Sequence, residues 1–128
     1  MKGYDFSVFS NVELIGVDLS ALDDEQLAVL YRQARYGTVM ESWFPLGGRG
    51  NTQTLFNDST ISAIASAHGK SSAQVIIRWH LQAGNICIPG SSNEQHIIED
   101  YDVWDFELSA DEMARMTALD KNQRFANY

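Results

Sequence analysis

The pattern of apolar and polar positions along the chain predicts strands that alternate with helices. The first clear helical pattern follows Asp23, which forms a capping box with Gln26. Apolar side chains then recur at helical spacing until Gly37, a residue typical of helix ends. They are Leu27, Leu30, Tyr31 and Ala34. Apolar segments on both sides of this helix predict two strands, at residues 12–19 and 38–43.

The middle of the chain predicts a loop and then a helix. A proline, three glycines and two asparagines within residues 45–57 indicate the loop. We interpret its glycine-rich part, residues 47–50, as a source of flexibility, with a lid over a site as the alternative. Asp58 or Ser59 can cap the next helix, and Gly69 can end it. One face of that helix carries Ile61, Ile64, Ala65 and His68.

Two further capping boxes mark the starts of later helices. One pairs Ser71 with Gln74, and the other pairs Ser109 with Glu112. The helix after Ser71 extends to about Ala83 and is apolar on several sides, so we expect it to be largely buried. Its apolar side chains are Val75, Ile76, Ile77 and Trp79. The apolar face and hydrophobic staple of the last helix comprise Leu108, Met113, Met116 and Leu119.

Between these helices, residues 85–100 predict a short strand, a turn of small residues and the start of another helix. The apolar residues 86–88 are too few for a helix, so we expect a buried strand, which a Pro-Gly pair ends. Ser92 or Asn93 can cap the helix that follows, which should end near Tyr101. Free N–H groups at this helix start, together with the helix dipole, favour an anion such as phosphate. An ordinary strand-to-helix connection with a normal cap is the alternative.

The order of these elements indicates an α/β protein. Strands that alternate with helices are typically parallel and joined by right-handed crossovers. The chain of 128 residues has a one-domain length, and no repeat or Pro- or Ser-rich linker divides it. We therefore expect residues 1–128 to form a single α/β unit with about three parallel strands and five helices.

Composition and charge narrow the range of partners. The chain is 45% hydrophobic and 11% aromatic, which is enough for a core. Its net charge is −8 and its nine basic residues are scattered, so we expect no nucleic-acid partner. The apolar runs are too short to cross a membrane, and the single Cys87, expected to be a core residue, fits a reducing, cytoplasmic location. The three histidines form no i,i+4 pair, so we expect no metal site.

Six segments carry a resemblance to the aldo-keto reductase family. They are residues 41–47, 55–58, 68–82, 88–93, 105–109 and 118–120, and they follow the family's order and spacing. Residues 41–47 read Glu-Ser-Trp-Phe-Pro-Leu-Gly, and residues 88–93 read Ile-Pro-Gly-Ser-Ser-Asn. The resemblance implies a partial (βα)8 TIM-barrel-like unit: the seventh and eighth strands, their helices and the additional helix after them. Residues 1–36 resemble the family weakly.

The resemblance implies a binding site for the nicotinamide dinucleotide NAD(P)H. Trp43 matches the aromatic residue that stacks on the nicotinamide ring, which requires a flat π-face, with a buried tryptophan at a strand end as the alternative. Leu46 and Gly47 match main-chain contacts to the pyrophosphate. At the adenosine end, Ser91, Ser92 and Glu99 match the family's residues. Gly90, His96 and Asp100 stand at further positions of that end. Asn11 resembles a residue that holds the nicotinamide amide, with an ordinary strand residue as the alternative.

Four positions depart from the family pattern. Phe44 stands where the family usually has Ser, and Asp100 stands where it usually has Asn. Gly90 and His96 replace the Lys and Arg that commonly hold the 2′-phosphate of NADPH. Histidine is mostly neutral at pH 7, so neither position keeps a full positive charge. We therefore expect a preference for NADH, or weak discrimination between the two cofactors.

The catalytic Asp, Tyr, Lys and His of the family come from its first four strands, which no segment of this chain resembles. We assign no catalytic residue, and we expect the chain alone to be inactive as a carbonyl oxidoreductase. Strands cut from a barrel leave open edges and exposed apolar surface, so we expect a homo-oligomer. The alternative is a non-enzymatic module that binds the dinucleotide or a partner and completes a barrel in trans.

Overall fold

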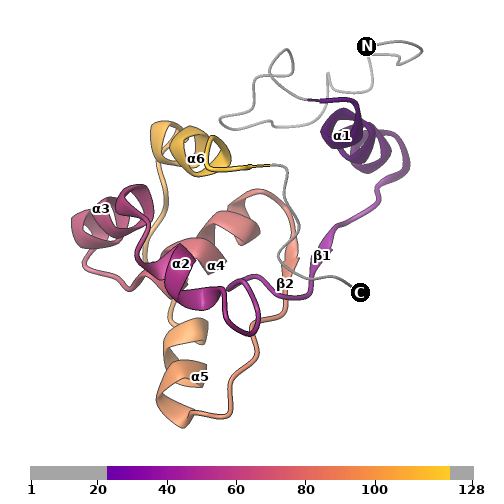
Figure 1. Cartoon of the computed structure of the whole chain (residues 1–128). Helices are drawn as coiled ribbons and strands as arrows, with labels where there is room; N and C mark the ends of the chain where they lie inside the picture. Colours follow the sequence, from indigo (N-terminus) through magenta and orange to yellow (C-terminus); the bar gives the residue numbers. More distant parts are fainter. Residues whose placement is uncertain (1–22, 122–128) are drawn as a thin grey trace.

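The computed structural model describes residues 23–121, which form six helices and a two-stranded parallel sheet (Figure 1). In chain order, the elements are α1 (Asp24–Tyr36), β1 (Glu41–Ser42), α2 (Thr52–Phe56), α3 (Ser59–His68), α4 (Ser72–Gln82), β2 (Ile86–Cys87), α5 (Glu94–Tyr101) and α6 (Ala110–Thr117). The strand expected at residues 12–19 lies outside the described residues. Within them, no helix is long and apolar enough to cross a membrane.

The helices begin at the residues that their capping patterns indicate. Asp23 caps α1, Ser71 caps α4 and Ser109 caps α6, and each forms both hydrogen bonds of a capping box. Of the alternatives left open by the sequence, Asp58 caps α3 and Asn93 caps α5. Three of the six starts therefore carry the reciprocal motif, which satisfies donors that a helix end would otherwise leave unpaired.

The two strands pair in parallel, with α2, α3 and α4 in the connection between them (Figure 1). The N–H of Ile86 donates to the carbonyl of Met40 at 2.8 Å, and that of Ile88 donates to the carbonyl of Ser42 at 3.1 Å. A parallel pair joined through helices is the βα arrangement expected from the sequence. It places the loops that follow β1 and β2 at the same end of the sheet.

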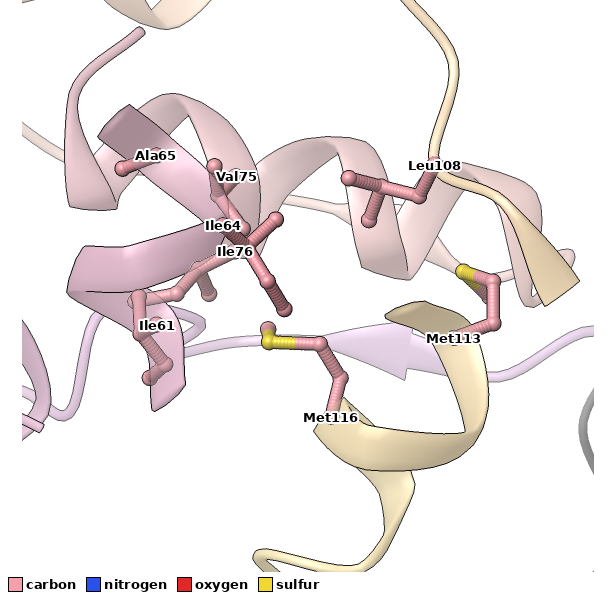
Figure 2. Packing of buried hydrophobic residues seen from close by; sticks show 8 residues of the cluster. All are labelled: Ile61, Ile64, Ala65, Val75, Ile76, Leu108, Met113 and Met116. Atoms are coloured by element: carbon pink, nitrogen blue, oxygen red, sulfur yellow. The ribbon is translucent and has the colours of Figure 1, made fainter. Parts of the chain in front are cut away.

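The hydrophobic core lies between helices, and no residue of the two strands belongs to it (Figure 2). Its buried members are Ile61, Ile64, Ala65, Val75, Ile76, Leu108, Met113 and Met116. They come from α3, α4, α6 and the segment before α6, where Leu108 and Met113 occupy the two staple positions. The apolar faces predicted for these three helices are confirmed, although Trp79 is only half-buried and packs at the border of the core.

Polar contacts tie α5 and α6 to α4. The side-chain amide of Gln74, a buried residue, donates to the carbonyl oxygens of Glu99 (3.2 Å) and Asp102 (2.8 Å) at the end of α5. The side chain of Gln82 accepts from the N–H of Leu108 at 2.7 Å and donates to its carbonyl at 2.9 Å. The Gln74 bonds hold α5, which has no buried residue of its own, against α4, and the Gln82 bonds hold the segment before α6.

Two expectations from the sequence were wrong. The segment at residues 86–88 is not a buried strand, because Ile86 is 49% exposed and Ile88 is 44% exposed. Within the described residues, the sheet consists of β1 and β2 alone, so β2 has no further strand beside it. The loop expected to run to Asn57 contains the extra helix α2, which makes six helices and not five. α2 has no side-chain cap, and it is held by the packing of Leu55 and Phe56 against the core.

Candidate functional site

An open cleft of about 880 Å³ lies where the loops after β1 and β2 meet α2, α5 and the first turn of α4. The residues expected at a dinucleotide site converge on it, although they come from segments far apart in the sequence. Those that line the cleft are Trp43, Leu46, Gly90, Ser91, Ser92, His96, Glu99 and Asp100. The exception is Gly47, a buried residue of the loop after β1 that does not line the cleft. A Cβ atom on Gly47 would lie 3.0 Å from the side chain of Leu55, so a larger residue does not fit there.

Trp43 stands at the mouth of the cleft with 60% of its surface exposed, so it is not the buried strand-end tryptophan that was the alternative. Its ring stacks on that of Phe44, with centroids 4.3 Å apart and planes 23° apart. Phe44 in turn lies over Gly48, where a Cβ atom would be 3.2 Å from the Phe44 ring. These contacts hold the aromatic pair against the loop that follows β1. A smaller polar residue at position 44 could not make the apolar contact that the Phe44 ring makes with Gly48.

The corner between Gly90 and His96 is open. A Cβ atom added at Gly90 would meet nothing within 4 Å, and the side chains of Ser92 and His96 are exposed. The cap of α5 occupies part of the helix start: Asn93 Oδ1 accepts from the N–H of Gln95 at 2.9 Å and from that of His96 at 3.4 Å. An anion at this corner would therefore depend more on hydroxyl groups than on these two N–H groups.

Two acidic side chains line the α5 side of the cleft, Glu99 and Asp100. Burial raises the pKa of Asp100, an effect that the charge of His96 opposes and that of Glu99 reinforces. Burial, and then the charge of Asp100, raises the pKa of the half-buried Cys87 thiol to about 11. The thiol is protonated at neutral pH, which favours the interpretation of Cys87 as a packing residue over a nucleophile.

Several residues that line the cleft were missed by the sequence analysis. They are Arg49, Thr52, Gln53, Phe56, Ser71, Ser72 and Ala73. Most belong to α2 or to the first turn of α4, and no sequence pattern brought these elements beside the β2 loop. A signal did exist for Arg49, since it is a cation in the glycine-rich loop next to Trp43.

A second, smaller hollow of about 290 Å³ lies between β2, α4 and α5, and its lining is mostly apolar. It is lined by Ile77, Leu81, Cys87, Pro89, Ile97, Asp100, Tyr101, Val103 and Trp104. Tyr101 is 77% exposed and Trp104 is 63% exposed at its edge. Residues 23–121 hold no group of three or more His, Cys, Asp or Glu side chains that could bind a metal ion.

Comparison with known proteins gives consistent matches. The model of the aldo/keto reductase family matches residues 21–121. An aldo-keto reductase from Mycobacterium sp. (strain KMS) is 44% identical over 91 residues, which cover 71% of this chain and 32% of that protein. The crystal structure of Gox0644 in its apoform has a TM-score of 0.72 at 36% identity, covering 80% of this chain and 36% of that one.

A variant of Gox0644 solved in complex with NADPH is 40% identical to this chain, with a TM-score of 0.58 over 71% of this chain and 34% of that one. This chain therefore spans about a third of the length of the relatives that it matches. The partial barrel unit expected from the sequence is confirmed by these structural matches. By its sequence and by its fold, the chain belongs to the aldo/keto reductase family.

Proposed function

We propose that this chain binds a nicotinamide dinucleotide, NAD(P)(H), in the 880 Å³ cleft, as the cofactor-binding part of an aldo/keto reductase. The observation that carries the proposal is the convergence on one cleft of the loops that follow two adjacent parallel strands. In barrels of alternating strands and helices, functional sites lie at the carboxyl ends of the strands, built from such loops. Dinucleotide binding here therefore uses the end of the sheet at which this fold class places its chemistry.

The residues that line the cleft fit the parts of a dinucleotide. The exposed indole of Trp43 offers a flat apolar face for the nicotinamide ring. The hydroxyl groups of Ser91 and Ser92 can donate to phosphate oxygens, and the carboxylates of Glu99 and Asp100 can accept from the adenine amine. The cofactor, when bound, would supply or accept hydride. The role of these residues is to bind and orient it.

We further propose that the cleft does not favour NADPH over NADH. Near the open corner, Gly90 offers no side chain and His96 offers an imidazole in place of a guanidinium, while Glu99 and Asp100 would repel an added phosphate. A charge-assisted hydrogen bond contributes roughly 1.5–3 kcal/mol, so the absence of two such bonds should cost NADPH about tenfold or more in affinity.

The direct test is titration of the purified chain with NADH and with NADPH, followed by quenching of tryptophan fluorescence and by calorimetry. Saturable binding of NADH that is at least as tight as that of NADPH is the expected result. Tighter binding of NADPH would overturn the cofactor preference alone, whereas no binding of either cofactor would overturn the proposed function.

Binding without turnover is the expected behaviour of the chain alone. The resemblance assigns the family's catalytic side chains to strands that precede the segment matched here, so we do not expect the family's Tyr acid beside a cofactor bound to the chain alone. The absorbance of reduced nicotinamide, followed with a generic aldehyde present, should stay constant. A steady decrease that depends on both aldehyde and protein would contradict this expectation.

A second candidate function is that of a module completed by another subunit, a second copy of the chain in the simplest case. The specific observation is the apolar surface along β2 and α5, beside the 290 Å³ hollow. Its exposed members are Ile97, Tyr101 and Trp104. Ile86 and Ile88 are also exposed on and next to β2, but Ile88 lines the 880 Å³ cleft. Burying such a patch is the usual driving force of association. Size-exclusion chromatography with light scattering should reveal a homo-oligomer, and a monomer at high concentration would refute it.

A further inference from the structure

Among the charged side chains that line the 880 Å³ cleft, acidic groups outnumber permanent cations. They are Arg49, His96, Glu99 and Asp100. Only Arg49 keeps a positive charge at every working pH, because a guanidinium does not lose its proton in proteins. The chain as a whole carries a net charge of −8. A ligand with two negative charges, such as a pyrophosphate, would otherwise enter a cleft with an acidic side and no permanent cation among its described lining residues.

The loop holds Arg49 in a defined position between two glycines. Gly48 and Gly50 have φ angles of +65° and +85°, a left-handed conformation that other residues rarely adopt. The carbonyl of Gly48 accepts from the N–H of Asn51 at 3.4 Å and from the hydroxyl of Thr52 at 3.2 Å. Together with the Phe44 ring above Gly48, these bonds fix the backbone next to Arg49 and leave its side chain exposed at the cleft.

The guanidinium of Arg49 forms no ion pair or hydrogen bond with any residue in the range 23–121. Two cations elsewhere in the described part of the chain, by contrast, have partners. Lys70 binds Asp105 at 2.7 Å and Arg78 donates to Gln82 at 2.9 Å. The donors of Arg49 therefore face solvent and the cleft, and they are available to a ligand.

We propose that Arg49 binds the pyrophosphate of the nicotinamide dinucleotide, an assignment that rests on the proposed function. Arg49 belongs to the loop that also carries Trp43, the residue for the nicotinamide end, while Ser91 and Ser92 line the adenosine end of the same cleft. The pyrophosphate is the part of the ligand that joins these two ends. A guanidinium binds phosphate oxygens through two parallel hydrogen bonds, and it also offsets the repulsion from Glu99 and Asp100.

This assignment makes different predictions for the pyrophosphate and for the 2′-phosphate. The pyrophosphate is common to NADH and NADPH, whereas the 2′-phosphate occurs in NADPH alone. Loss of the Arg49 charge should therefore weaken both cofactors by the same factor and leave their ratio unchanged. If Arg49 bound the 2′-phosphate, only NADPH would be weakened.

The experiment measures the dissociation constants of NADH, NADPH and ADP-ribose by calorimetry for the wild-type chain and three variants. Arg49→Gln should weaken all three ligands by about tenfold to about a hundredfold, which is the usual worth of a charge-assisted contact. Arg49→Lys keeps the charge but loses the planar guanidinium, so its affinities should lie between those of the wild type and of Arg49→Gln. The matched control is Arg32→Gln, which removes the same charge from an exposed position on α1 outside the cleft and should leave binding unchanged.

Salt provides a second readout that does not depend on how well a variant folds. Ligand binding by the wild type should weaken with ionic strength more steeply than binding by Arg49→Gln, since screening acts on the charge contact that the variant lacks. Circular dichroism and thermal melting check that the variant keeps its fold.

The possible outcomes lead to distinct conclusions. Equal binding by wild type and Arg49→Gln, or a loss confined to NADPH, would overturn the assignment of Arg49 while the proposed function stands. The same loss in Arg32→Gln would show a general effect of net charge and would also overturn it. A wild-type chain that binds none of the three ligands would overturn the proposed function itself, and the Arg49 assignment with it.

Discussion

On the side of the molecule formed by α3, α4 and α6, apolar side chains meet one another (Figure 2). On the side formed by β2 and α5, several apolar side chains are exposed. Ile64 is 1% exposed on the first side, and Ile98 is 56% exposed on the second. The two residues differ in surroundings and not in chemistry. The helical side holds the stabilising burial, and the sheet side holds the candidate site.

The polar groups follow the same division. On the helical side, charges are paired: His68 contacts Glu112 at 3.0 Å, and Lys70 contacts both Asp102 and Asp105. On the sheet side, the charges of the cleft are left to solvent or to a ligand, as at Arg49. A region that binds a ligand keeps polar groups unsatisfied until the ligand arrives, and a region that stabilises the fold does not.

The comparison is tested most strongly by truncating one apolar side chain on each of the two sides of the molecule. Ile64→Ala should lower the free energy of unfolding by about 2–5 kcal/mol, because it leaves a cavity in a closed core. Ile86→Ala, at a position about half exposed on β2, should cost much less. Urea unfolding followed by circular dichroism measures both. Equal losses would mean that β2 is covered in solution, and so would support association of the chain.

On the sheet side, the cofactor preference can be reversed by design. Gly90→Lys combined with His96→Arg should raise the affinity for NADPH relative to NADH by about tenfold or more, since each change adds a charge-assisted contact. Gly90 tolerates the change because a Cβ atom there meets nothing within 4 Å. Calorimetry with both cofactors measures the ratio, and an unchanged ratio would show that the open corner does not face the 2′-phosphate.

On the helical side, substitutions can distinguish the capping residue of α3 from the residue next to it. Asp58 Oδ1 accepts from the N–H of Thr60 at 2.9 Å and from that of Ile61 at 3.1 Å. Asp58→Ala should therefore destabilise the fold by about 1 kcal/mol. Ser59→Ala, one residue further into α3, is the control and should be nearly neutral. Denaturant midpoints compare the two, and a larger effect of the Ser59 change would reassign the cap.

The smallest expected effect is on the stability of the fold at acidic pH. Burial raises the pKa of Glu112, but hydrogen bonds from His68 and from Ser109 outweigh it and hold the pKa below its usual value. A carboxyl group with a depressed folded-state pKa adds stability above its unfolded pKa, and that stability is lost as pH falls through the folded-state pKa. The melting temperature of the wild type should fall in acid slightly more than that of Glu112→Gln. Identical acid profiles would contradict a role for this pair.

Local signals predicted the helices well. Asp23, Ser71 and Ser109 were identified as capping residues because a cap needs only one side chain and the next turn of the chain. The left-handed Gly37 and Gly69 end α1 and α3 for a similar local reason. The failures were non-local. α2 lacks a cap and depends on contacts of Leu55 and Phe56 with distant residues, so no nearby pattern indicates it.

The candidate site was only partly predictable. The resemblance to the family pointed to Trp43 and to the residues from Gly90 to Asp100, which line one cleft. It did not indicate that Gly47 is buried under Leu55 or that Arg49 opens into the cleft. These facts depend on how the loop after β1 lies against α2, and that arrangement depends on the packing of side chains.

The sequence by itself determined where every described helix but α2 begins, which faces of α3, α4 and α6 are apolar, and which family the chain resembles. These features depend on neighbours within about one helical turn, or on residue identity alone. Only the tertiary structure decided that the isoleucines of the β2 segment are exposed and that two distant loops form one cleft. Burial and convergence are properties of what lies across from a residue, and an apolar run reads the same whether or not another element covers it.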